Sequence, residues 1–103
     1  MGLYERLRAI RDAGGLDVCA KAVACMLASR CNADDVAWPS IETLAADAGI
    51  RPTATRAAVE RLVILGVLRV ERHVHAPHRY RFHDDALARL ARSPRNADLA
   101  KRG

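Results

Sequence analysis

The hydrophobic pattern of the chain changes from a helical to an alternating period at Gly66, and this change restricts the possible folds more than any other feature. Before Gly66, apolar residues recur roughly every three to four positions, which is the spacing of one face of an α-helix. After Gly66, apolar residues alternate with charged ones, as a half-buried β-strand requires. The sequence therefore predicts a mainly α fold with a small β-hairpin at its C-terminal side.

Four helical segments are predicted before Gly66, at residues 3–13, 18–30, 41–48 and 52–65. The second segment is apolar on most of its circumference, so it should lie in the centre of the core. Asp17 and Ser40 are predicted N-caps, and Pro52 suits the first turn of a helix. Arg6 is expected on the surface of the first segment. The buried face of the fourth segment is predicted to consist of Thr55, Ala58, Val59, Leu62 and Val63.

The hairpin after Gly66 is predicted from alternating segments at 68–71 and 78–82, joined by a turn at 73–77. A further short strand is predicted at 36–38. Trp38, Tyr80 and Phe82 are interpreted as packing groups of the core and the hairpin, in preference to the alternative that they stack on bases. Asp84 is predicted to cap a final short helix.

The charge of the chain favours a polyanionic partner. The chain has 103 residues, which is the size of one domain, and a formal net charge of +5. An excess of arginine attracts nucleic acid through Coulomb forces and counterion release. No apolar run reaches the ~20 residues that a membrane span needs, so we expect a cytoplasmic protein with no membrane contact. The three cysteines are spaced by six residues and point in different directions on a helix, which favours free thiols over a metal site.

The order of the elements also suits DNA. Two helices separated by a tight turn at Gly49 are followed by a hairpin. A helix fits the major groove of B-DNA, so the second helix of such a pair can enter it while a hairpin holds the adjacent backbone.

The segment PSIETLAADAGIRPTATRAAVERLVILGVLRV resembles the winged helix-turn-helix family, in which the hairpin is called the wing. The resemblance covers residues 16–82. Its relatives include transcriptional regulators and plasmid or phage replication and partition proteins. The resemblance implies binding of double-stranded DNA. It also implies that Thr53, Ala54, Arg56 and Ala57 face the major groove, with Ser40 and Thr43 near phosphate. At Arg51 and Pro52 the sequence departs from the family, which commonly has a Ser or Thr cap here.

Arg56 is the best candidate for a base contact, because arginine paired with guanine is the commonest specific contact. The alternative for Arg56 is a solvated helix face with an ion pair to Glu60. Basic and imidazole side chains of the hairpin are expected on phosphates. The predicted DNA-binding residues are Ser40, Thr43, Arg51, Pro52, Thr53, Arg56, Arg61, Arg72, His73, His75, His78 and Arg79.

Three regions are predicted along the chain. Residues 1–15 form an N-terminal helix whose stripe of Leu3, Leu7 and Ile10 either mediates dimerisation or folds back on the core. Residues 16–91 form the winged helix-turn-helix domain, and residues 92–103 form a basic, flexible tail. Because one recognition helix makes few contacts, a homodimer on paired half-sites is favoured.

Other functional classes find little support in the sequence. It contains no nucleophile elbow, phosphate-binding glycine loop or convincing pair of carboxylates, so we expect no enzymatic activity, cofactor or small-molecule substrate. The four histidines of the hairpin region lack the companions of a closed metal site. The remaining alternative is a winged-helix module that binds protein and not DNA.

Overall fold

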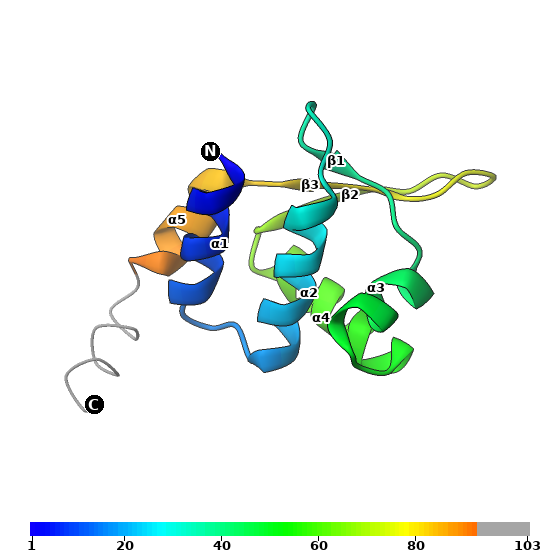
Figure 1. Cartoon of the computed structure of the whole chain (residues 1–103), viewed down its shortest axis with the longest axis horizontal. Helices are drawn as coiled ribbons and strands as arrows, with labels where there is room; N and C mark the ends of the chain where they lie inside the picture. Colours follow the sequence, from blue (N-terminus) through cyan, green and yellow to red (C-terminus); the bar gives the residue numbers. More distant parts are fainter. Residues whose placement is uncertain (93–103) are drawn as a thin grey trace.

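The computed structural model describes residues 1–92, which form five helices and a three-stranded antiparallel sheet (Figure 1). The helices are α1 (Leu3–Asp12), α2 (Val18–Arg30), α3 (Ile41–Ala48), α4 (Pro52–Ile64) and α5 (Asp84–Ala91). The strands are β1 (Val36–Ala37), β2 (Leu68–Glu71) and β3 (Arg79–Phe82). The mainly helical fold with a small sheet confirms the prediction. The predicted basic tail lies, except for Arg92, outside the described residues.

The sheet is larger than the predicted hairpin, because the short strand β1 joins it. β3 lies in the middle, with β2 on one side and β1 on the other. Val36 pairs with Arg81, and Ala37 pairs with Tyr80. Ala37 and Tyr80 are buried, whereas Arg79 and Arg81 are exposed. Since side chains alternate along a strand, the sheet has an inner face against the helices and an outer face that bears arginines.

Helix α2 is the centre of the molecule, as its apolar circumference predicts. It contacts α1, α3, α4 and β1, and Figure 1 shows it in the middle of the helices. Asp17 caps it, because the Asp17 side chain accepts a hydrogen bond from the Ala20 amide at 2.8 Å. Its fully buried residues include Val23 and Leu27, and the small Ala24 between them lets neighbouring helices approach closely.

Helices α3 and α4 are joined by a tight turn. Gly49 ends α3 with a φ of +71°, a backbone conformation that a side chain disfavours. Ile50 is half-buried against the core, and Pro52 occupies the first turn of α4 as predicted. The buried face of α4 includes Thr55 and Leu62. Val63, which was predicted on this face, is 40% exposed, because it lies about 100° around the helix from Leu62.

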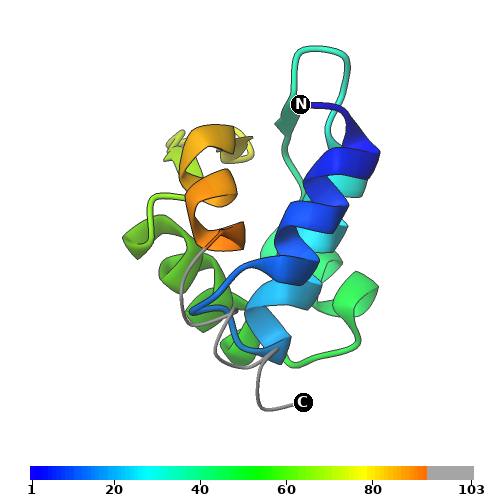
Figure 2. The same ribbon diagram turned by 90° about the vertical axis from the view of Figure 1, so that its left-hand side faces the viewer.

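Helices α1 and α5 lie side by side at the end of the molecule opposite the hairpin (Figures 1 and 2). Ile10 is fully buried and Leu7 is partly buried, so two residues of the predicted stripe pack on the chain's own core. Leu3 remains 49% exposed. The backbone amide of Gly14 donates to the Leu90 carbonyl at 2.9 Å, which ties the end of α1 to the end of α5.

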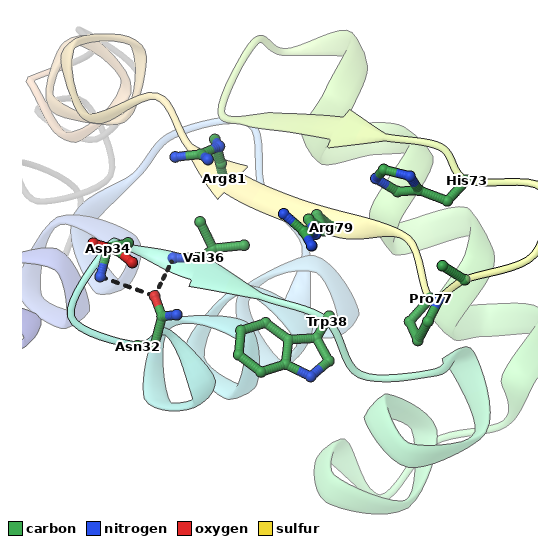
Figure 3. Close-up of a pocket in the computed structure, with 9 residues that line it drawn as sticks. Asn32, Asp34, Val36, Trp38, His73, Pro77, Arg79 and Arg81 are labelled. Atoms are coloured by element: carbon green, nitrogen blue, oxygen red, sulfur yellow. Dashed lines mark hydrogen bonds between the residues drawn. The ribbon is translucent and has the colours of Figure 1, made fainter.

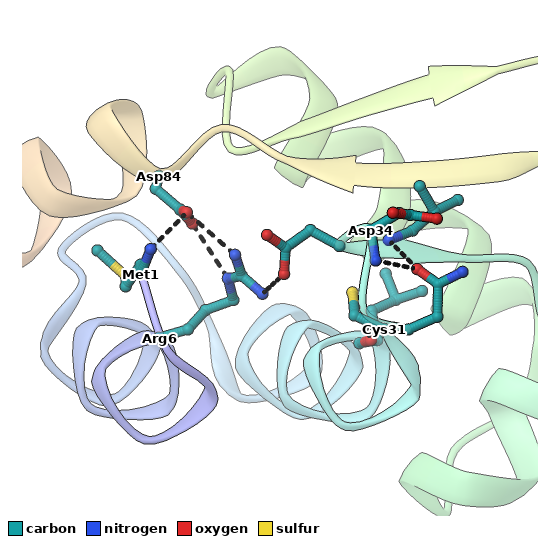
Figure 4. Close-up of polar contacts among 9 residues, drawn as sticks. Met1, Arg6, Cys31, Asp34 and Asp84 are labelled. Atoms are coloured by element: carbon teal, nitrogen blue, oxygen red, sulfur yellow. Dashed lines mark hydrogen bonds and ion pairs between the residues drawn. The ribbon is translucent and has the colours of Figure 1, made fainter.

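Arg6 is not on the surface, contrary to the prediction: it is only 2% exposed. Its Nε and Nη2 atoms donate to both carboxylate oxygens of Asp84 at 3.0 Å, and Nη1 donates to Asp35 at 3.3 Å (Figure 4). The guanidinium carbon lies 5.0 Å from the centre of the Phe82 ring. The hydrogen bond with Asp84 is the main cause that raises the pKa of Arg6 above its usual value. Arg6 therefore joins α1, α5 and the loop before β1.

This pairing also explains a second correction. Asp84 was predicted to cap α5, but the cap is His83, whose Nδ1 accepts from the Ala86 amide at 3.1 Å. Asp84 is the first helical residue and its carboxylate is turned toward Arg6. The bidentate contact with a buried guanidinium is stronger than a cap bond to a neutral amide.

Replacing Arg6 tests this cluster. Arg6→Met keeps much of the side-chain volume but removes the bidentate guanidinium from Asp84, which is left with the N-terminal ammonium of Met1 at 3.7 Å. We expect the free energy of unfolding, measured by urea denaturation, to fall by about 2–4 kcal/mol, less than for a fully enclosed pair because both carboxylates reach solvent. Arg89→Met removes an exposed arginine from α5 and should change stability by less than about 0.5 kcal/mol. Equal effects of the two substitutions would show that the Arg6 cluster does not hold the helices together.

Candidate nucleic-acid interface

The first turn of α4 is exposed and has no side-chain cap. Arg51 precedes the helix in an extended conformation, and its side chain makes no capping hydrogen bond. Its carbonyl instead accepts from the amide and the hydroxyl of Thr55, at 2.9 and 3.0 Å. Pro52 and Thr53 are exposed. The free backbone amides of this turn, together with the positive end of the helix dipole, favour an anion.

Arg56 lies one turn further along α4 and is exposed, as a groove-facing residue must be. It does not pair with Glu60. Its guanidinium lies 4.0 Å from the carboxylate of Glu42 on α3. Both side chains are more than half exposed, so this contact contributes little and is readily exchanged for another anion. Ala57, beside Arg56, is exposed and small enough to permit close approach.

The start of α3 holds the two predicted hydroxyl groups in contact with each other. The Ser40 oxygen accepts from the Thr43 amide at 3.1 Å, so Ser40 is the predicted N-cap. The Ser40 hydroxyl also donates to the Thr43 hydroxyl at 3.0 Å, so Ser40 uses its one donor within this pair and only the Thr43 hydroxyl retains a hydrogen for a phosphate. Arg61 is exposed in the last turn of α4, roughly 15 Å from Arg51 along the helix axis.

The hairpin loop, residues 72–78, projects as an arm beyond the body of the molecule (Figure 1). Arg72 and His75 are exposed, and His78 is partly buried. The backbone amide of His73 donates to Nδ1 of His78 at 3.2 Å, a bond that closes the loop. Nε2 of His73 lies 3.9 Å from a carboxylate oxygen of Glu71.

Arg79 lies elsewhere, on the outer face of the sheet. We define the outer sheet face as Val36, Trp38, Arg69, Glu71, Arg79 and Arg81, which point away from the helices. Figure 3 shows Arg79 beside Trp38, at an open depression of about 720 Å³ that His73 also lines. Among the predicted residues, Arg51, Pro52, Thr53 and Arg56 thus share one end of α4, whereas Arg79 and His73 line a different surface.

The prediction that Trp38 is a packing residue is wrong, because its side chain is 51% exposed. Ala37 faces inward opposite Tyr80, so the next residue points outward. Tyr80 does pack in the core, where burial raises the pKa of its phenol. The sequence analysis also missed Arg69 and Arg81. The alternation of apolar and charged residues along 68–71 and 79–82 indicated that both arginines point outward. It did not reveal that Trp38 lies on the same face.

The Ser40 cap leads to a stability prediction. Ser40→Ala removes the acceptor for the Thr43 amide and should lower the free energy of unfolding by about 1 kcal/mol in chemical denaturation. Ser40→Asp provides an equally good acceptor and should retain nearly all of the stability. A similar loss in both variants would mean that the capping bond does not stabilise α3.

Within residues 1–92, no group of three or more histidine, cysteine or acidic side chains is arranged to hold a metal ion. The cysteines are free thiols, and burial raises the pKa of Cys25 and Cys31. None of the helices in the described part of the chain is long and apolar enough to cross a membrane. No protein-family model, curated protein or solved structure matches the chain.

Proposed function

We propose that this chain is a winged helix-turn-helix protein that binds double-stranded DNA in a sequence-specific manner, with α4 in the major groove. One observation carries the proposal: the exposed, uncapped first turn of α4 presents Arg51, Thr53 and Arg56 beyond the helix pair that supports it. The order of the elements, α2, β1, α3, α4 and then the β2–β3 hairpin, agrees with such a fold.

The shape of α4 suits the groove. A helix with its side chains is about 10–12 Å wide, which matches the major groove of B-DNA at about 12 Å. Thr53 and Ala57 are small, so the helix backbone can approach the base edges closely. Arg56 then reaches a guanine, whose N7 and O6 atoms accept two parallel hydrogen bonds from a guanidinium.

In this proposal, contacts with the phosphates of the DNA backbone orient α4. The amides at the start of α4 and the Arg51 side chain are available for one phosphate, and the Thr43 hydroxyl is available for another. Arg72 and His75 of the hairpin loop extend the contact along the duplex. We leave Arg79 out of this interface, because it lies on the outer sheet face with Trp38.

The proposed function involves no catalysis. Its effect is the occupancy of a DNA site, which can block a promoter or mark a replication or partition sequence. A second copy on an adjacent half-site would double the contacts, and we retain the homodimer as part of the proposal.

Arg56 provides the test of base recognition. A preferred duplex is first selected from a random-sequence pool, and affinities are then measured by fluorescence anisotropy. We expect Arg56→Ala to lose about 1–3 kcal/mol of binding free energy on the selected duplex and little on a shuffled duplex, because a base contact acts only at its own sequence. Arg89→Ala, which removes the same charge from α5, should leave both affinities nearly unchanged.

The outcomes separate the rival functions. Equal losses on both duplexes would assign Arg56 to phosphate. A wild-type chain that binds neither duplex at low salt would contradict DNA binding, and it would favour the protein-interaction module, in which α4 contacts a partner protein.

Arg72 tests the hairpin loop. Removal of one phosphate contact lowers the slope of log affinity against log salt concentration by about 0.9. We therefore expect Arg72→Ala to weaken binding to all duplexes alike and to reduce this slope by about one unit. An unchanged slope in a salt titration would exclude Arg72 from the backbone contacts.

A further inference from the structure

We propose that the outer sheet face is a second nucleic-acid site, which binds an unpaired stretch of a DNA single strand by stacking a base on Trp38 and holding its phosphates with Arg79 and Arg81. This site is separate from α4. Duplex binding by α4 and single-strand binding by the outer sheet face are therefore independent properties of the chain.

The arginines of this face lack enough carboxylates to neutralise them. Arg69 and Arg81 stand directly opposite each other on β2 and β3, an arrangement of like charges that destabilises a sheet. Arg81 is paired with Glu71, at 3.3 Å between Nε and Oε1. Glu71 stands opposite Arg79 in the same register, but within residues 1–92 no carboxylate lies within ion-pairing distance of Arg69 or Arg79. A chain of phosphates would relieve this repulsion and provide bidentate partners for the guanidiniums.

The indole of Trp38 supplies the second element of the site. A half-exposed tryptophan beside Arg79 offers a flat apolar surface next to a positive charge. Bases stack on such side chains in sites for single-stranded nucleic acid, alongside basic groups that follow the backbone. In a duplex, each base is already covered by its stacked neighbours. The Trp38 platform therefore selects an unpaired base.

The open depression that Trp38 and Arg79 line has dimensions and polarity that suit an unpaired base. Its volume of about 720 Å³ lies within the usual range for small organic ligands, about 300–1,000 Å³. Asn32 and Asp34 line the end that lies away from the hairpin loop (Figure 3). The side-chain oxygen Oδ1 of Asn32 already accepts from the Asp34 and Val36 backbone amides, at 2.9 and 3.1 Å. The side-chain NH2 group of Asn32 therefore remains available to a base.

The positive charge of the outer sheet face would also attract an acidic peptide. The exposed indole favours the single strand, because carboxylate side chains have no aromatic ring to stack on it. The guanidinium groups of this face also favour a nucleic-acid strand, because a guanidinium matches phosphate in bidentate geometry.

Trp38 is the only tryptophan in the chain, so its fluorescence reports directly on this site. The full chain is titrated with an oligothymidylate of about ten nucleotides, and with an oligomer of the same length that lacks the bases. We expect the oligothymidylate to quench Trp38 and the abasic oligomer to leave its emission nearly unchanged. We also expect the abasic oligomer to bind about tenfold more weakly, since stacking of one base accounts for a difference of this order.

Variants separate stacking from charge, with binding measured by anisotropy of a labelled oligothymidylate. Trp38→Ala should weaken binding about tenfold, and Trp38→Phe should retain most of the affinity because it keeps a stacking ring. Arg81→Gln should weaken binding and lower its salt dependence, whereas Arg89→Gln on α5 should do neither. Circular dichroism melting checks that each variant is folded.

Three results would overturn the site: unchanged Trp38 emission with oligothymidylate, equal affinity for the abasic oligomer, or equally strong quenching by an oligoglutamate peptide. The last would assign the face to an acidic protein segment. Quenching by oligothymidylate in a chain that fails to bind duplex DNA would support this site and contradict the proposed function of α4. Trp38→Ala should leave duplex binding by α4 intact.

Discussion

The close packing of α2 against its neighbours is the interaction on which the rest of the structure depends. With few aromatic residues available, the core is built from Leu, Val and Ala side chains, and buried alanines such as Ala24 bring the helices close together. Dispersion forces fall off steeply with distance, so small side chains at the contacts compensate for the missing bulk. Because α2 occupies only the Thr55 and Leu62 side of α4, the opposite side of α4 remains free for a ligand.

A buried charge supplements this thin core. Desolvation of a guanidinium costs several kcal/mol, and only good geometry with several hydrogen bonds offsets it. Arg6 meets this condition through Asp84, Asp35 and the face of Phe82. The same contacts fix the direction in which the chain leaves β3 and enters α5. The terminal helices are thereby held at one end of the molecule, away from the hairpin loop and the start of α4 (Figures 1 and 2).

The sequence predicts those features that depend on neighbours along the chain. Helix bounds, the Asp17 and Ser40 caps and the turn at Gly49 follow from local periodicity and capping chemistry, and the structure confirms them. The position of Arg6 could not be predicted, since its partner Asp84 is 78 residues away. The outward orientation of Trp38 requires the register of β1 against β3, which no local pattern reveals. The prediction that Trp38 packs in the core was based only on its hydrophobic side chain.

The two proposed surfaces differ in how their charge is balanced, and this difference bears on what each can do. At α4, Arg56 lies near Glu42, so the attraction of this surface for any polyanion is partly cancelled. Selective affinity there must come from hydrogen bonds to base edges, which act at one sequence only. On the outer sheet face, Arg81 likewise pairs with Glu71, but Arg69 and Arg79 have no carboxylate within ion-pairing distance in residues 1–92, and the proposed stacking on Trp38 suits any base. The site proposed on that face would therefore bind with little regard to sequence. With the proposed duplex at α4 and the proposed unpaired strand on the sheet, a DNA site beside a locally opened segment would satisfy both surfaces at once, and linkage through a single protein would raise the affinity for such a junction above that for either part.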